Sequence, residues 1–376
     1  MITYLDNSAT TQPCPEAVAA ITEALEEDWG NPSSQHELGR RAEHLLEDAR
    51  RSAAEALGAQ PERVFFTSGG TEADNWAVFG AARRMAHRRA RRIVTTAVEH
   101  DAVLNPVREL ERQGCPVTYL APDETGLVSP DALRGALGPD VGLVSVMMVN
   151  NESGAVMPIA EMVRAVRRAC PDALFHTDAV QGFLKVPFRA SSLGADLISV
   201  SGHKIHASKG VGALWIRPGL TLPPLLYGGG QEKALRSGTE NLPAIAGFGA
   251  ACAAAYPGLR EELAEMTRLR DLARERLAAI PGCVLLARGD APHIVPLSVP
   301  GVRSQGLINC LQDEGVYVSA GSACSKGRRS HVLTAMGLPN DVVDGAIRVS
   351  LSRFTTEADV GRLAAAMAKA VAELKK

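Results

Sequence analysis

Short apolar runs alternate with helical patterns from about residue 60 to 250, and this alternation restricts the fold more than any other feature of the sequence. The runs have no polar face, which favours a mostly parallel sheet covered by helices, an α/β fold. Ligands of such sheets bind at the carboxyl ends of the strands. The expected strands are 64–66, 93–96, 143–149, 173–176, 197–200 and 213–216, and the expected helices include 17–27, 36–57, 72–85, 102–113 and 159–169.

The pattern changes after residue 258. Apolar residues at helical spacing over 259–280 predict a long amphipathic helix, and short strands are expected at 294–299 and 316–318. We therefore predict a large domain over residues 1–255 and a small α+β domain over residues 256–376, with the N-terminal segment partly joining the small domain. A chain of 376 residues is long enough for two cores.

Composition excludes several functional classes. The 40 basic and 42 acidic side chains leave a net charge of -2, which gives no reason to expect direct contact with nucleic acid or an anionic membrane. The longest apolar run is too short to cross a bilayer, and no signal peptide is visible. The seven cysteines are scattered without Cys-x-x-Cys spacing, which argues against a disulfide framework and a zinc site. We expect a cytoplasmic protein without a metal.

One basic run interrupts this balance. Residues 83–92 hold six arginines, which suit either a nucleic-acid patch or a solvated helix C-terminus. We favour the helix terminus, because cations complement the helix dipole there.

Two expected strands end in residues suited to catalysis or to holding a cofactor. Lys204 follows the strand at 197–200, and a lysine in a partly dry cleft has a lowered pKa and a more nucleophilic amine. The alternative is a lysine whose head reaches water from a strand end. Asp178 follows another strand, where a carboxylate can hold a protonated ring nitrogen of a cofactor, with Gln181 beside the ring's phenolic oxygen. The alternative for Asp178 is a helix N-cap.

The segment from Phe66 to Glu72 joins a strand end to a helix start through small residues. Free backbone N–H groups there, with the Thr71 hydroxyl, form an anion site suited to a phosphate. The alternative is ordinary capping of the helix by Ser68 or Thr71.

Cys324 lies in a loop of small residues that is followed by three cations. The backbone freedom of that loop and the neighbouring charge favour a mobile thiolate, although most cysteines are simply buried. Three further candidates are weaker alone. His100 could stack on a ring, Asn151 follows a strong strand, and Arg348 could clamp a carboxylate, but each also suits an ordinary structural position.

Taken together, ordered motifs along essentially the whole chain resemble the PLP-dependent cysteine desulfurases of the NifS/IscS type, in the class V aminotransferase fold family. The resemblance implies PLP fold type I, with a mostly parallel, seven-stranded sheet in the large domain, and a homodimer that acts on L-cysteine. The motifs are residues 4–11, 30–34, 67–72, 150–152, 176–178, 201–204, 236–239, 321–324, 348 and 353–356.

The resemblance also implies a role for each matching residue. Lys204 would carry pyridoxal 5'-phosphate (PLP) as a Schiff base, His100 would stack on its ring, and Cys324 would receive sulfur as a persulfide. Asn31 and Arg348 would bind the substrate carboxylate. The cofactor would be held by Gly70, Thr71, Asn151, Asp178, Gln181, Ser201, His203 and Lys204, with Thr239 of the partner subunit.

The resemblance leaves several points open. The family usually has Tyr-Gly-Pro where this chain has His206-Ala-Ser, and we expect this change to alter the wall beside Lys204. The sulfur acceptor could be a scaffold for iron–sulfur clusters or a tRNA-thiolating enzyme. Alternative functions are selenocysteine lyase, another class V aminotransferase, or a non-catalytic sulfur-relay or assembly partner, which the intact Lys204, Asp178 and Cys324 argue against.

Overall fold

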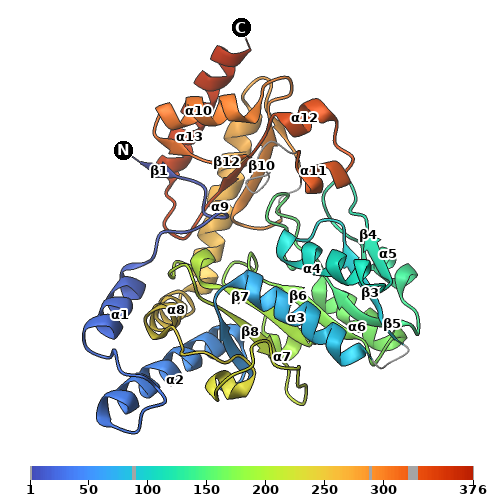
Figure 1. Cartoon of the computed structure of the whole chain (residues 1–376). Helices are drawn as coiled ribbons and strands as arrows, with labels where there is room; N and C mark the ends of the chain where they lie inside the picture. Colours follow the sequence, from blue (N-terminus) through green and yellow to red (C-terminus); the bar gives the residue numbers. More distant parts are fainter. Residues whose placement is uncertain (1, 87–89, 288–289, 321–328, 376) are drawn as a thin grey trace.

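The computed structural model describes residues 2–86, 90–287, 290–320 and 329–375. A seven-stranded sheet forms the core of the lower body in Figure 1, in the order β2-β8-β7-β6-β5-β3-β4. Only β8 runs antiparallel to its neighbours, so the mostly parallel sheet predicted from the sequence is confirmed. The strands are β2 Val64–Thr67, β3 Arg92–Thr96, β4 Val117–Leu120, β5 Val141–Ser145, β6 Leu174–Asp178, β7 Leu197–Ser201 and β8 Gly212–Ile216.

Both faces of this sheet are buried, as the apolar runs predicted. Successive residues of a strand point to opposite faces, and on β2 the side chain of Phe65 packs in one core while Phe66 packs in the other. Helix α3 covers the face of Phe65, and α2, α6 and α8 contribute to the other core. The helices of this body are α1 Pro15–Glu26, α2 Glu37–Leu57, α3 Gly70–Met85, α4 Asp101–Arg112, α5 Pro130–Ala136, α6 Ile159–Ala169, α7 Ala190–Leu193 and α8 Leu242–Ala255, with the 3-10 turns η1 Pro61–Arg63, η2 Gly202–Lys204 and η3 Gln231–Ala234.

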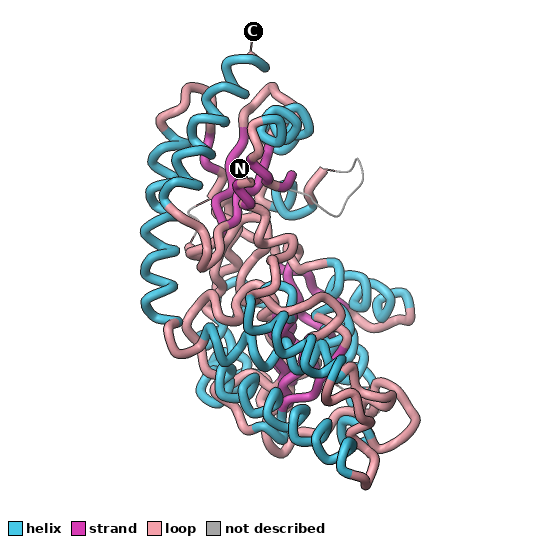
Figure 2. The backbone as a smooth tube through the Cα atoms, turned by 90° about the vertical axis from the view of Figure 1, so that its left-hand side faces the viewer, coloured by secondary structure: helices cyan, strands magenta, loops and turns pink. Residues whose placement is uncertain are grey.

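A smaller body holds the C-terminal part of the chain. Its four-stranded antiparallel sheet has the order β12-β13-β10-β9, and α9 is the long amphipathic helix expected there. Figure 2 shows the strands of the two bodies one above the other along the molecule. The elements are α9 Leu259–Ala278, β9 Val284–Leu285, β10 Ile294–Ser298, α10 Ser304–Asp313, β11 Val316–Tyr317, β12 Ser319–Ala320, α11 His331–Ala335, α12 Asn340–Asp344, β13 Ala346–Ser350 and α13 Glu357–Leu374.

The N-terminal segment reaches into the smaller body. Strand β1, Thr3–Tyr4, lies parallel to β11, and the amide of Ser350 donates to the carbonyl of Leu5 at 2.7 Å. The chain then returns to the large sheet through residues 8–12. A division of the chain at residue 255 stays a prediction.

Two strand expectations were wrong in detail. β5 ends at Ser145 rather than at residue 149, although the amides of Val146 and Met148 still donate to carbonyls of β6. Asn150 ends the run, because its Oδ1 accepts from the next turn at the amides of Glu152 and Ser153. Strand β4 was not predicted, because three of its four residues are half-buried and it lacks a fully apolar run.

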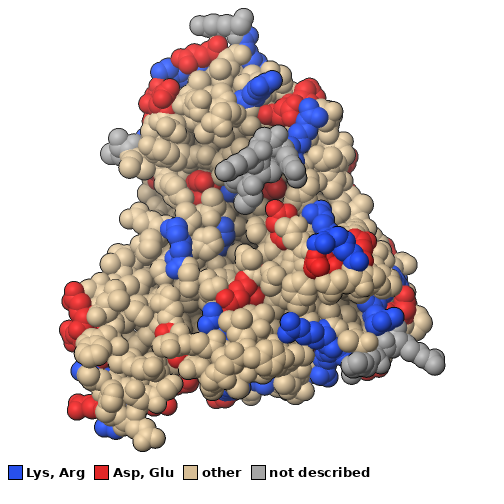
Figure 3. Space-filling model, viewed as in Figure 1, with Lys and Arg blue, Asp and Glu red and all other residues tan. Residues whose placement is uncertain are grey.

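The surface agrees with the nearly balanced charge. Basic and acidic side chains are interspersed on the face seen in Figure 3. From the basic run, Arg83 and Arg84 donate to backbone carbonyls of Pro224 and Thr221, both at 3.2 Å. Among the described residues, no single helix is both long and apolar enough to cross a membrane; the pair α8 and α9 passes such a test together but is bent by 79°.

Candidate active site

The predicted motifs meet at one edge of the large sheet. Strands β2, β6 and β7 run in the same direction, so the segments that follow them share that edge. A cavity of about 430 Å³ opens there. Ten of the predicted site residues line it: Gly70, Thr71, His100, Asn151, Asp178, Gln181, Ser201, His203, Lys204 and Arg348.

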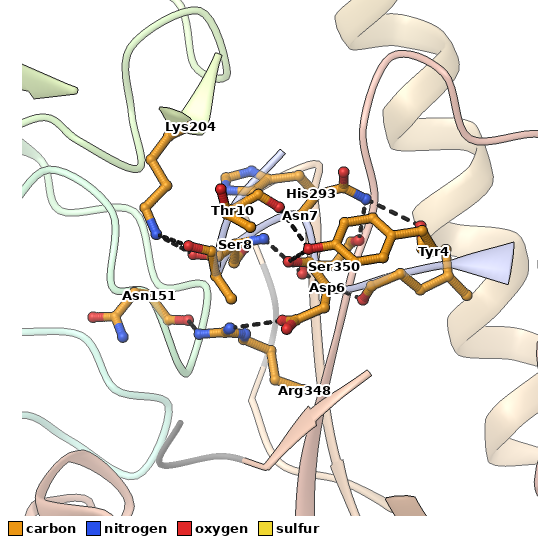
Figure 4. A network of polar contacts seen from close by, with 12 residues as sticks. Tyr4, Asp6, Asn7, Ser8, Thr10, Asn151, Lys204, His293, Arg348 and Ser350 are labelled. Atoms are coloured by element: carbon orange, nitrogen blue, oxygen red, sulfur yellow. Dashed lines mark hydrogen bonds and ion pairs between the residues drawn. The ribbon is translucent and has the colours of Figure 1, made fainter. Parts of the chain in front are cut away.

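Lys204 lies in the turn η2, directly after β7. Its Nζ donates to the carbonyl oxygens of Ser8 at 2.5 Å and Ala9 at 2.7 Å (Figure 4). The lysine head therefore contacts the N-terminal segment at the cavity wall instead of extending into water.

Asp178 is the last residue of β6, and its Oδ1 accepts from the amide of Val180 at 2.8 Å. Burial, reinforced by the nearby carboxyl of Asp74, raises the pKa of Asp178 to about 7. Burial likewise raises the pKa of Asp74 to about 7. Since both carboxyls line the cavity, a cationic group bound there would favour their ionised forms.

His100 caps the start of α4. Its Nδ1 accepts from the amide of Ala102 at 3.1 Å. In the neutral ring this assigns the proton to Nε2, so the other edge of the imidazole is a hydrogen-bond donor.

The start of α3 is suited to an anion. The N-cap is Gly69, no side chain caps the helix, and its first-turn N–H groups are left for another partner. The expected alternative of capping by Ser68 or Thr71 is therefore wrong. The hydroxyl of Ser201 is buried without a hydrogen-bond partner, which leaves it available to a ligand oxygen.

Gly70 keeps this end of the cavity open. A Cβ at Gly70 would lie 2.6 Å from Cγ2 of Val180, closer than real contacts allow. Glycine is needed because the helix start packs directly against the segment that follows β6.

Arg348 lies on β13 and is almost fully buried, so the alternative of a solvated strand face is wrong. Its Nη1 donates to the backbone oxygen of Asn151 at 2.8 Å, and its Nη2 pairs with Asp6 at 3.1 Å (Figure 4). Its Nε is buried without a hydrogen-bond partner. The guanidinium is thus held from two sides and retains a donor for a carboxylate.

Two predicted residues lie elsewhere in this chain. Asn31 and Thr239 are exposed and do not line the cavity. The side chain of Asn31 instead accepts from the amide of Ser33 at 2.9 Å. Cys324 falls in 321–328, outside the described residues, so its role and those of Asn31 and Thr239 stay predictions.

The predicted effect of His206 on the wall beside Lys204 stays a prediction. Its Nδ1 lies 2.8 Å from the carbonyl of Gln12, and its ring meets that of Phe354 at 4.8 Å between centroids. These contacts hold His206 outside the lining of the 430 Å³ cavity, but His206 and Lys204 both line a smaller pocket of about 30 Å³.

Sequence reasoning missed other lining residues. Ser8 and Ala9 contribute carbonyl oxygens, which no side-chain pattern reveals. Asp74 lies one turn after Gly70, and this helical spacing was the signal that could have found it. No group of three or more His, Cys, Asp or Glu side chains in the described part of the chain could hold a metal ion.

Comparison with known proteins places the chain in a family. The family described as "Aminotransferase class-V" matches residues 3–363. The chain belongs to the class-V aminotransferase family. This family uses PLP. The membership of this chain in the family confirms the resemblance that the motifs predicted.

Individual members of the class-V family are similar to this chain over nearly its whole length. The chain is 42% identical to cysteine desulfurase IscS of Methanosarcina thermophila over 377 residues, which is 99% of this chain and 92% of that protein. It is also 42% identical to a cysteine desulfurase of Trichormus azollae, over 100% of this chain and 94% of that one. A solved NifS-like protein has a TM-score of 0.94 at 36% identity and covers all of both chains, which confirms the fold class.

The residues present fit the cofactor of the class-V aminotransferases. An uncapped helix start and the unpartnered Ser201 hydroxyl suit a phosphate, and buried Asp178 suits a protonated ring nitrogen. Lys204 presents an amine at the same cavity. The phosphate, the ring nitrogen and the aldehyde of PLP therefore each have a matching partner.

Proposed function

We propose that this class-V family member is a PLP-dependent cysteine desulfurase. The observation that carries the proposal is one cavity lined by Lys204, Asp178 and Arg348. The names of its relatives support the choice of L-cysteine as substrate.

Each residue then has a task around the substrate. Arg348 binds the carboxylate of L-cysteine, and the Nζ of Lys204 removes the proton from its Cα. Asp178 keeps the ring nitrogen of PLP protonated, and His100 stacks on the ring. When bound, PLP takes up the electron pair left on Cα.

The sulfur atom of the substrate is transferred to Cys324. A thiolate is the nucleophilic form of cysteine, so Cys324 attacks the substrate sulfur as a thiolate. The C–S bond of the substrate breaks and an S–S bond forms. One L-cysteine and one Cys324 thiol thus yield one L-alanine and one Cys324 persulfide.

The enzyme acts as a homodimer in this proposal. Thr239 is exposed on the segment after η3 and would join the phosphate site of a second copy. The persulfide passes its sulfur to an acceptor protein for iron–sulfur cluster assembly or tRNA thiolation. The described cysteines are all free thiols, which suits a reducing cytoplasm.

A paired product assay tests this function. Purified wild type should form sulfide and alanine in equal amounts from L-cysteine with a reductant. Cys324→Ala should lose both products while it keeps the visible absorbance of bound PLP, and Cys310→Ala, at a half-buried cysteine of α10, is the matched control. Full activity of Cys324→Ala would refute the sulfur step. Amino transfer to a keto acid without sulfide would favour an aminotransferase.

A further inference from the structure

Lys185 is a buried lysine that the proposed reaction does not use. Only 6% of its surface is exposed, and its Nζ lies 3.4 Å from Oε1 of Gln181. Lysines are almost never this buried without an acidic partner. Here burial lowers the pKa of Lys185, and the nearby cations Lys204 and Arg348 lower it further. Lys185 therefore places an N–H donor beside Gln181, and burial and the neighbouring cations disfavour its charged form.

His293 approaches the same oxygen. Its Nε2 lies 3.3 Å from Oε1 of Gln181, and the ring is fully buried. On the other side of the amide, Nε2 of Gln181 donates to the carbonyl of Ser8 at 2.9 Å. Because a carbonyl can only accept, the amide nitrogen must face Ser8 and the amide oxygen must face Lys185 and His293.

The orientation matters because Gln181 lines the cavity and Lys185 does not. An amide nitrogen carries two N–H groups, and the contact with Ser8 uses one of them. The same Ser8 carbonyl accepts from Lys204, so the amide of Gln181 lies beside the lysine that would carry the cofactor. The second N–H of Gln181 is therefore available at this side of the cavity.

We propose that Lys185 is a positioning residue that locks the amide of Gln181 as a hydrogen-bond donor toward the phenolic oxygen of PLP. This inference rests on the proposed function, because it requires PLP in the cavity. Lys185 acts only through Gln181, so its effect must vanish when the Gln181 amide is removed.

A double-mutant cycle on PLP-loaded protein tests this dependence. The readout is the pH midpoint of the visible absorbance change of bound PLP. A hydrogen bond to the phenolic oxygen spreads its negative charge and weakens its hold on a neighbouring proton. Lys185→Met should therefore raise the midpoint by about one pH unit, a tenfold change in the proton equilibrium. Gln181→Ala should raise it similarly, and the double variant should show no further rise.

Controls separate this role from a general loss of packing. Lys233→Met removes an exposed lysine and should leave the midpoint unchanged. No shift in Lys185→Met, or an equal shift with and without the Gln181 amide, would overturn the inference. If Lys185→Met does not fold, Lys185→Gln keeps an N–H donor and should hold the midpoint within ~0.3 pH unit of wild type; a larger shift would overturn the inference. Wild type without any visible PLP absorbance would instead refute the proposed function itself.

Discussion

Replacing Arg348 by lysine should weaken the use of L-cysteine and leave PLP bound. The guanidinium makes two contacts with the protein, to Asn151 and Asp6, and still has a buried Nε without a partner. A lysine ammonium is one point of charge and cannot keep both contacts while it also donates to a carboxylate. One hydrogen bond to a charged group contributes about 1.5–3 kcal/mol, so kcat/KM should fall about 10- to 150-fold.

The assay is the initial rate of alanine formation over a range of L-cysteine concentrations. The visible absorbance of bound PLP, measured in parallel, should match the wild type. Arg362→Lys is the matched control, because Arg362 makes an ion pair with Asp359 on α13, away from the cavity. A kcat/KM within about twofold of wild type would refute the reasoning, as would a parallel loss of PLP, which would show a structural role for Arg348.

Three further predictions concern stability and cofactor binding. Arg50→Met leaves the carboxylate of Glu232 buried without its ion-pair partner at 2.8 Å, so the free energy of unfolding in denaturant titrations should fall by about 3–5 kcal/mol. The double variant Arg50→Met, Glu232→Leu should recover most of this loss. An Arg50→Met variant as stable as wild type would contradict the reasoning. In PLP-free protein the pKa of Asp74 is raised from 3.8 to about 7. Its contribution to stability is therefore complete below pH 3.8 and is lost as the pH rises from there through about 7. Asp74→Asn should therefore flatten the decline of the unfolding temperature over this range, and an unchanged slope would count against the assignment. Gly70→Ala should weaken PLP binding by about 5- to 150-fold, because its Cβ would meet Cγ2 of Val180 at 2.6 Å; Val180→Ala in the same chain should restore binding, and failure to do so would exclude this clash as the cause.

Much of the fold could be predicted because it is encoded locally. Apolar runs and helical spacing reveal strands and helices one segment at a time, and α6 and α9 begin where the sequence places them. The strand ends then identify the edge where Asp178 and Lys204 meet. Strand β4 escaped prediction because its half-buried residues give no apolar run.

The rest of the site depends on contacts between distant parts of the chain. Asp6 and Arg348 are 342 residues apart in sequence and 3.1 Å apart in space. Backbone carbonyls such as that of Ser8 have no signature in the sequence, because any residue can supply one. Sequence alone also left open whether Lys204 points to water or to protein, since both fit a lysine at a strand end.

The route of the N-terminal segment has a consequence for biosynthesis. Strand β1 has its parallel neighbour β11 more than 300 residues later, and the carbonyl of Ser8 meets Lys204 between these two points. A ribosome adds about 5–20 residues per second, so the first strand waits on the order of tens of seconds for its neighbour. Until then the emerging chain lacks Arg348, and it also lacks the pairing of β1 with β11 that holds the N-terminal segment near Lys204. Binding of the cofactor therefore requires the finished polypeptide. A chain that stops just before residue 316 would contain all seven strands of the large sheet and still lack a complete pocket.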